Sequence, residues 1–335
     1  MLLALLCSGC GKQDSGAYDR GLADMAAGEY DAAIEEFQTA ADKDGREAEA
    51  YRCEGIVFLK KGTPKAAISL LELSLEKMQY EDETFSEDVK YYLAEAYEED
   101  GQETEALSLY QELEQGNSPA RAMLLEGQLQ LNQGNTEEAD RLFSEAVQQD
   151  GSAENYIAIY EAYSNVKLEA NGADYLQEFI SSVTEETGNT YELGLCYYYL
   201  GEYSKAKEVL LAATEDKDTD AIMLLGRLYM QDGETGNARD LFQRCLSEGS
   251  NSGTVYNGLA LCSMEEGDYE TALDYINDGL ATADAEEKES LLFNEIIIYE
   301  GLQQYDVAKE KVEYFLQDYP DNESAVREKT FLESR

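Results

Sequence analysis

The chain has 335 residues and contains no histidine, which excludes imidazole-based catalysis and imidazole metal sites. Its 71 acidic residues outnumber its 25 basic ones, so the net charge is −46 and the chain would repel both nucleic acids and anionic lipid surfaces. Apolar residues make up 43% of the chain, enough for a folded core, and only three prolines occur. This composition favours a protein that is helical almost throughout, with short turns.

The N-terminus carries a short apolar run, residues 1–6, followed by Cys7, Ser8, Gly9 and Cys10. The run is too short to span a membrane. Small residues before a cysteine, with a polar stretch after it, resemble the end of a bacterial lipoprotein signal peptide, although Cys7 stands where leucine is usual. The resemblance implies a signal remnant over residues 1–9, lipidation of Cys10 and a polar tether over 10–16.

If so, we expect the signal to begin upstream of Met1. Two other interpretations stay open at this point. The segment could be an inert leader from a misplaced start, or a redox C-x-x-C motif. The redox interpretation needs a preceding strand and a following helix N-terminus, and the sequence offers neither.

An internal repeat of about 34 residues follows. A short motif of glycine, an acidic residue and tyrosine, followed by alanine, occurs within residues 28–34, 201–206 and 267–273. The last alanine of this motif recurs about every 34 residues along the chain. One interval is twice as long and contains a degenerate unit around Ala173. Its positions are Ala33, Ala67, Ala106, Ala139, Ala206, Ala238, Ala272 and Ala308. About 12 positions earlier lies a second small residue: Gly21, Gly55, Ala94, Gly127, Gly194, Gly226 and Ala260.

This pattern resembles the tetratricopeptide repeat, a pair of antiparallel helices with small residues where they cross. The sixth unit matches the family pattern at Leu193, Gly194, Tyr197, Ala206, Leu210 and Ala213, and the seventh at Leu225, Gly226, Tyr229, Ala238 and Phe242. The resemblance implies an all-α, right-handed α-α superhelix, a solenoid of about nine helical hairpins over residues 17–320. Residues 321–335 then form an amphipathic helix that caps the last apolar face.

The spacing also makes local predictions. The first small residue of each unit lies on the core stripe of the first helix, so it should let the second helix approach closely. The fifth unit lacks this glycine and has Asn171 and Gly172 inside its second helix, so we expect a local kink or a change of pitch there. A glycine before the second helix should form a left-handed C-cap in most units: Gly28, Gly62, Gly101, Gly134, Gly201, Gly233 and Gly267.

No motif for chemistry emerges, so we expect no catalytic residues, no metal site and no cofactor. Acidic residues are so frequent that no carboxylate pair stands out as a general acid and base, and a solvated surface explains them. Residues 42–45 resemble the opening of a calcium loop but lack its closing glutamate. Cys53, Cys196, Cys245 and Cys262 are expected to be buried thiols, with a disulfide or metal site as the alternative.

A binding surface is implied by the family resemblance, in which positions 5, 9 and 12 of the first helices face a ligand in the concave groove. In the sixth to eighth units these positions form an unusually apolar stripe: Tyr191, Leu195, Tyr198, Met223, Arg227, Met230, Asn257, Leu261 and Met264. Such a stripe suits peptide recognition, but it could also be extra core or an oligomer contact. The third unit has Tyr91, Glu95 and Glu98 instead, so the groove should turn acidic there.

We therefore expect a non-catalytic scaffold that binds a protein or peptide partner, not nucleic acid. It would be lipid-anchored through Cys10, extracytoplasmic and bacterial, with no other membrane segment. The alternative is a soluble cytoplasmic adaptor or regulator of the same fold.

Overall fold

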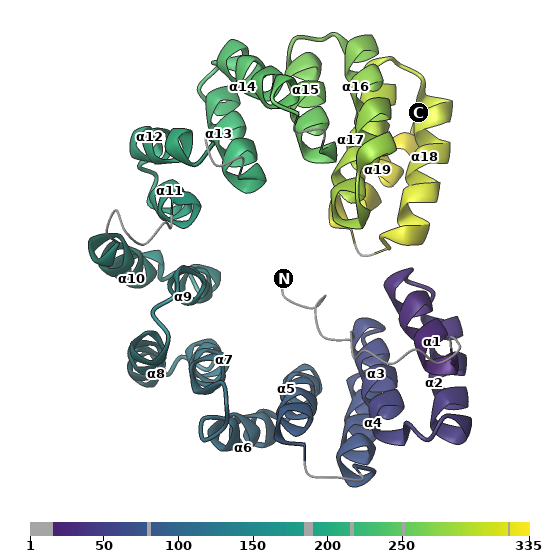
Figure 1. Ribbon diagram of the computed structural model, residues 1–335, viewed down its shortest axis with the longest axis vertical. Helices are drawn as coiled ribbons and strands as arrows, with labels where there is room; N and C mark the ends of the chain where they lie inside the picture. Colours follow the sequence, from purple (N-terminus) through teal and green to yellow (C-terminus); the bar gives the residue numbers. More distant parts are fainter. Residues whose placement is uncertain (1–15, 79–81, 184–189, 215–217, 250–251, 321) are drawn as a thin grey trace. The chain divides into compact units, whose positions relative to one another are not determined.

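The computed structural model describes residues 16–78, 82–183, 190–214, 218–249, 252–320 and 322–335. In these ranges the chain forms nineteen α-helices and no strands, which confirms the all-α prediction (Figure 1). None of the helices found there is long and apolar enough to cross a membrane. The cysteine predicted to carry a lipid, Cys10, lies outside the described residues, as do all residues of the predicted signal remnant.

The chain divides into two compact units between Gly172 and Ala173, which is inside the degenerate fifth repeat, and each unit is described by itself. The first unit contains α1 (Ala17–Ala26), α2 (Tyr30–Lys43), α3 (Glu47–Lys60), α4 (Pro64–Glu76), α5 (Glu83–Glu99), α6 (Glu103–Leu113), α7 (Pro119–Asn132), α8 (Thr136–Gln149) and α9 (Ala153–Asn165). The division falls within α10 (Glu169–Ser182).

The second unit contains α11 (Thr190–Tyr199), α12 (Tyr203–Ala213), α13 (Thr219–Gln231), α14 (Thr235–Ser247), α15 (Gly253–Glu265), α16 (Tyr269–Thr282), α17 (Ala285–Gly301), α18 (Tyr305–Asp318) and α19 (Glu323–Glu333). Consecutive helices pack against each other from α1 to α9 and from α11 to α19. The first helices of successive hairpins are also in contact: α11 contacts α13, and α13 contacts α15. This stacking is the arrangement of a helical repeat array.

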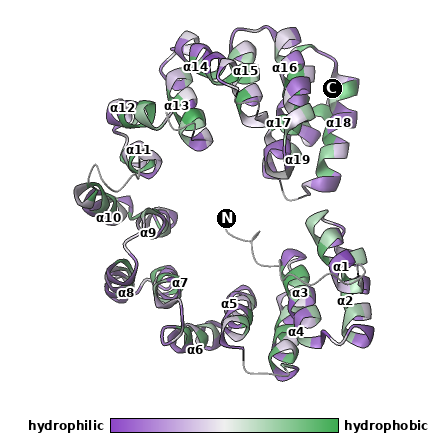
Figure 2. Ribbon diagram, in the orientation of Figure 1, coloured by the Kyte–Doolittle hydropathy of each residue, from purple (hydrophilic) through white to green (hydrophobic). Residues whose placement is uncertain are grey.

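The sequence explains several of the helix ends. Polar side chains accept a backbone N–H at several N-termini, such as Asp218 from Ala221 at 2.9 Å and Asn322 from Ala325 at 2.9 Å. Most helices carry both polar and apolar residues, as helices do that bury one stripe (Figure 2). The seven predicted C-cap glycines all have positive φ, between 63° and 83°, which confirms the predicted turns.

Close helix crossings are also confirmed. A Cβ atom placed on Gly194 would lie 2.6 Å from Leu210, and one on Gly127 would lie 2.6 Å from Phe143. Each glycine thus faces a large residue of the second helix that is almost fully buried. Gly21, Gly55 and Gly226 meet Phe37, Leu71 and Phe242 in the same way. Because even the methyl group of alanine would lie too close to these side chains, the glycine sets the distance between the two helices of its hairpin.

In the fifth repeat the large residue lies on the first helix and the small one on the second, the reverse of the other repeats. Tyr160 occupies the position of the small residue on α9, and the glycine is on the other helix, where a Cβ on Gly172 would lie 2.8 Å from the Tyr160 Cα atom. Asn171 and Gly172, which were expected to disturb the second helix, lie in its first turn, and α10 continues without interruption to Ser182.

The four cysteines beyond the leader are buried, as predicted for core thiols. Cys53, Cys196 and Cys262 have no exposed surface and Cys245 is 4% exposed. Burial raises the pKa of the Cys196 thiol to about 12 and that of Cys262 to about 11, so neither is a thiolate at neutral pH.

Candidate functional site

The predicted binding stripe lies on the first helices of three successive hairpins in the second unit. Helix α11 carries the first three of its residues, α13 the next three and α15 the last three. Because α13 contacts both α11 and α15, the three sets belong to one continuous layer of helices. The helical spacing of i, i+4 and i+7 keeps each set on one side of its helix.

The apolar members of the stripe are half-buried. Tyr191, Leu195, Tyr198, Met223 and Met230 pack against the core formed by α12 to α15, and none of them is completely covered. Leu261 and Met264 are also partly exposed. The stripe therefore rests on the core with one side and offers the other side to solvent. By contrast, Leu225 on α13 and Leu259 on α15 have no exposed surface and belong to the core.

A pocket of about 310 Å³ opens in this layer. It brings together four residues of the predicted stripe: Met223, Arg227, Met230 and Leu261. The remaining walls are Gln231, Phe242 and Glu265, none of which the sequence analysis had assigned to the site. Phe242 belongs to α14 and is 1% exposed, so its ring closes the inner end of the pocket while the flexible methionines line its sides.

Other predicted residues lie elsewhere. Tyr191, Leu195, Tyr198 and Met264 do not line this pocket. Asn257 is 6% exposed, and its Oδ1 atom accepts a hydrogen bond of 2.7 Å from Asn294 Nδ2 of α17. The Asn257 side chain is therefore used in packing α15 against α17 and is not presented to a ligand.

Carboxylates gather at the α11 end of the stripe. Burial raises the pKa of Tyr191, and the charges of Asp220, Asp218 and Glu192 raise it further, while Arg227 acts in the opposite direction. Burial and the neighbouring Asp218 also raise the pKa of Asp220. The potential at this end of the stripe is therefore negative, and Arg227 compensates for it only in part.

A second pocket, of about 380 Å³, lies in the first unit between α5, α6 and α7. Its lining includes Tyr91, Glu95 and Glu98, the three residues that predicted an acidic surface in the third repeat. Arg121 of α7 stacks on the Tyr91 ring, 4.1 Å from its centroid, and Tyr110 donates a hydrogen bond to Glu98. Burial raises the pKa of Tyr91 to about 12 and raises that of Glu95 and Glu98. The sequence analysis did not place Arg121 here.

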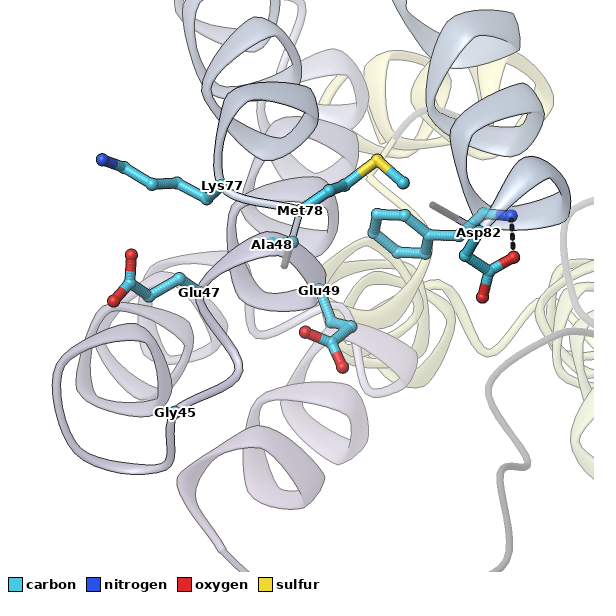
Figure 3. A pocket seen from close by; sticks show the side chains of 8 residues that line it. Gly45, Glu47, Ala48, Glu49, Lys77, Met78 and Asp82 are labelled. Carbon is cyan, nitrogen blue, oxygen red and sulfur yellow. Dashed lines mark hydrogen bonds between the residues drawn. The ribbon is translucent and has the colours of Figure 1, made fainter. Parts of the chain in front are cut away.

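A third pocket, of about 320 Å³, lies beside the turn between α2 and α3 and contains none of the predicted binding residues. Its lining includes Glu47, Glu49, Lys77, Met78 and Asp82 (Figure 3). Asp82 is the N-cap of α5 and accepts a hydrogen bond of 3.0 Å from the Phe85 backbone N–H, the contact drawn in Figure 3. Lys77 and Met78 extend in different directions, so the view shows no convergence of polar groups on one point.

Within the described ranges, no group of three or more cysteine, aspartate and glutamate side chains is arranged to hold a metal ion. The apolar pocket of the second unit has no nucleophile paired with a base among its lining residues. What the arrangement offers chemically is an adaptable apolar surface with charged groups at its edge, which suits recognition of another chain.

Comparison with known proteins gives the following matches. A model of the tetratricopeptide repeat matches residues 18–80, 191–253 and 224–287, and a second model of this repeat matches 88–115. Together the matches cover more than half of the chain. No curated protein matched the sequence.

Solved structures resemble the chain in fold at low identity. PilF of Pseudomonas aeruginosa is 19% identical over 63% of this chain and 96% of its own, with a TM-score of 0.40. A tetratricopeptide repeat protein from Parabacteroides merdae is 14% identical over 74% of this chain and 98% of its own, with a TM-score of 0.41. The Cut9–Hcn1 hetero-tetramer of the APC/C gives 16% identity and a TM-score of 0.42; the match covers 96% of this chain but 63% of that one.

Proposed function

Because this chain belongs to the tetratricopeptide-repeat family, whose members generally mediate protein–protein interactions, we propose that it is a non-catalytic scaffold that binds a segment of a partner protein. The partner lies along α11, α13 and α15 of the second unit. Its apolar side chains contact the half-buried stripe, and one of them enters the pocket above Phe242.

The observation that carries this proposal is the pocket itself. Four side chains from two neighbouring first helices, two of them methionines, converge on one apolar cavity of about 310 Å³. A cavity of this size accommodates one large apolar side chain, and methionine can adjust its rotamers to the shape of that side chain. A few buried anchors of this kind supply most of the energy in protein interfaces.

We propose further that the scaffold is tethered to the outer side of a bacterial membrane by a lipid on Cys10. Ser8, Gly9 and the polar stretch that follows Cys10 support this proposal. The full gene product should label with a radioactive fatty acid, and Cys10→Ser should abolish the label. A full-length product that stays soluble and unlabelled would support the alternative, a cytoplasmic adaptor, without affecting the proposed binding stripe.

The proposed site can be tested by placing a photo-crosslinking amino acid at Leu261, inside the pocket, and at Leu211 as a matched control. Leu211 is an apolar residue of a second helix, α12, and is 47% exposed. Crosslinking in native cells should capture a partner at position 261 and not at position 211. The captured protein is then purified, and its affinity is measured for the unmodified chain, Leu261→Asp and Leu211→Asp. Equal loss of affinity in both variants, or in neither, would contradict the site.

A further inference from the structure

Some carboxylates of the second unit form ion pairs, whereas three beside the binding stripe form none with any described residue. At the ends of the first helices, acidic residues pair with cations of the second helices: Asp232 and Glu234 with Lys207, and Glu266 with Arg239. Glu192, Asp220 and Glu265 form no ion pair within 4.0 Å in the described part of the chain. Several cations of this unit thus compensate charges at the hairpin turns, and no described cation forms an ion pair with the three carboxylates beside the stripe.

These three carboxylates lie at the two ends of the stripe. Glu192 and Asp220, with Asp218, act on Tyr191 at the α11 end, and Glu265 lines the pocket at the α15 end. Arg227 is the one cation that lines the pocket. A ligand therefore meets an apolar surface that is bounded by negative charge on two sides.

We propose that the segment bound by the second unit is cationic and amphipathic, with apolar anchors for the stripe and Lys or Arg side chains placed to meet Glu192, Asp220 and Glu265. The inference rests on the proposed function and adds the chemistry of the partner. Two features beyond the local geometry support it. The net charge of −46 attracts a basic partner from a distance and speeds its association, and for the same reason it repels a second copy of this chain.

The test uses three peptides that share leucines at i, i+3, i+4 and i+7 and differ only in the polar residue between them: lysine, glutamine or glutamate. Affinities for the full chain are measured calorimetrically at low salt. The lysine peptide should bind about tenfold more tightly than the glutamine peptide, and the glutamate peptide should not bind, because complementary rim charges favour association. Raising the salt to about 0.3 M should remove most of the difference, since the screening length is then short.

A charge-matched pair of variants separates local recognition from general attraction. The groove variant combines Glu192→Gln, Asp220→Asn and Glu265→Gln. The control variant removes the same number of charges from exposed positions of the second helices: Glu208→Gln, Asp240→Asn and Glu270→Gln. The groove variant should lose the preference for lysine over glutamine, and the control should keep it. Equal loss in both variants would overturn the inference.

The failure of this inference can be distinguished from failure of the proposed function. If the glutamine peptide binds as tightly as the lysine peptide, and Leu261→Ala weakens both, the binding stripe stands and its charge preference is wrong. If Leu261→Ala leaves the affinity for every peptide unchanged, the stripe is not the binding site, and both proposals fail. Circular dichroism melts of each variant confirm that the compared proteins are folded.

Discussion

At the scale of single residues, Lys167 and Gln303 adopt the left-handed conformation that glycine adopts in the other hairpin turns. Their φ angles are 64° and 60°, against 73° for Gly201 in the equivalent turn. A side chain in this conformation is disfavoured by about 1 kcal/mol because its Cβ atom approaches the backbone carbonyl. These two turns, in the fifth and ninth repeats, are therefore strained relative to the rest.

Gln303→Gly should stabilise the protein by roughly 0.5–1 kcal/mol, since it relieves this strain at an exposed position. The neighbouring residue Gln304 provides the control, because its φ is −89° and glycine there only adds freedom to the unfolded chain. Urea unfolding curves of the two variants should shift in opposite directions. A shift in the same direction would show that the turn at Gln303 is not strained.

At the scale of helices, most hairpins depend on a small residue that faces a large one 16 positions later, as Gly127 faces Phe143. Gly127→Ala should lower the free energy of unfolding by about 1–3 kcal/mol through overpacking, because the new methyl group would lie 2.6 Å from the Phe143 ring. Phe143→Leu also destabilises the protein by itself, since it empties part of the core.

The double variant tests whether the two residues act as a pair. Ala260 and Ile276 occupy the same positions in the eighth repeat and are both buried, so alanine opposite a branched aliphatic residue is compatible with the fold. Gly127→Ala combined with Phe143→Leu should therefore be more stable than the sum of the two single changes predicts. Strictly additive free energies of unfolding would contradict direct contact between the two positions.

These crossings could be predicted from the sequence because both residues of each pair belong to one hairpin and recur at fixed spacing. The exposure of the stripe could not be predicted from the sequence, because it depends on how successive hairpins stack. Asn257 illustrates the difference: it follows the helical spacing of the stripe, yet it is buried and accepts a hydrogen bond from Asn294, a residue of the following hairpin. Phe242 was predicted as a framework aromatic, and only the structure shows that it closes the pocket.

At the scale of the whole molecule, stability should depend on pH through two carboxyl pairs. Burial raises the pKa of Glu300 to about 7, helped by Glu328, and burial raises that of Glu114 to about 7, helped by Glu126. Arg141 lowers the pKa of Glu114 and Glu145 raises it slightly. In the unfolded chain these groups titrate near 4.3, so between about pH 4.5 and 7 the folded protein binds more protons.

The melting temperature should therefore fall by a few degrees as the pH rises from about 5 to about 8. The double variant Glu114→Gln and Glu300→Gln removes the two carboxyl groups whose pKa is raised and should flatten this profile. Glu137→Gln, at an exposed position of α8, should leave the slope unchanged. A melting temperature that rises over this pH range would show that carboxylates with lowered pKa values control stability.

Salt should stabilise the molecule because its net charge is −46 and self-repulsion opposes the compact state. Raising sodium chloride from roughly 0.01 to 0.3 M shortens the screening length several-fold. We expect the melting temperature to rise over this range at constant pH. A flat or falling melting temperature would mean that attractive ion pairs, such as that between Arg52 and Asp88 at 2.8 Å, outweigh the repulsion.

The central claim is that the half-buried stripe on α11, α13 and α15 contacts a partner, and hydroxyl-radical footprinting tests it directly, since methionine and tyrosine react readily. Oxidation is measured by mass spectrometry with and without the partner captured at position 261. We predict that Tyr198, Met223 and Met230 become protected, whereas Tyr314, which is 57% exposed on the second helix α18, reacts as before. Unchanged oxidation of the stripe, or protection of only the second helices, would contradict the account.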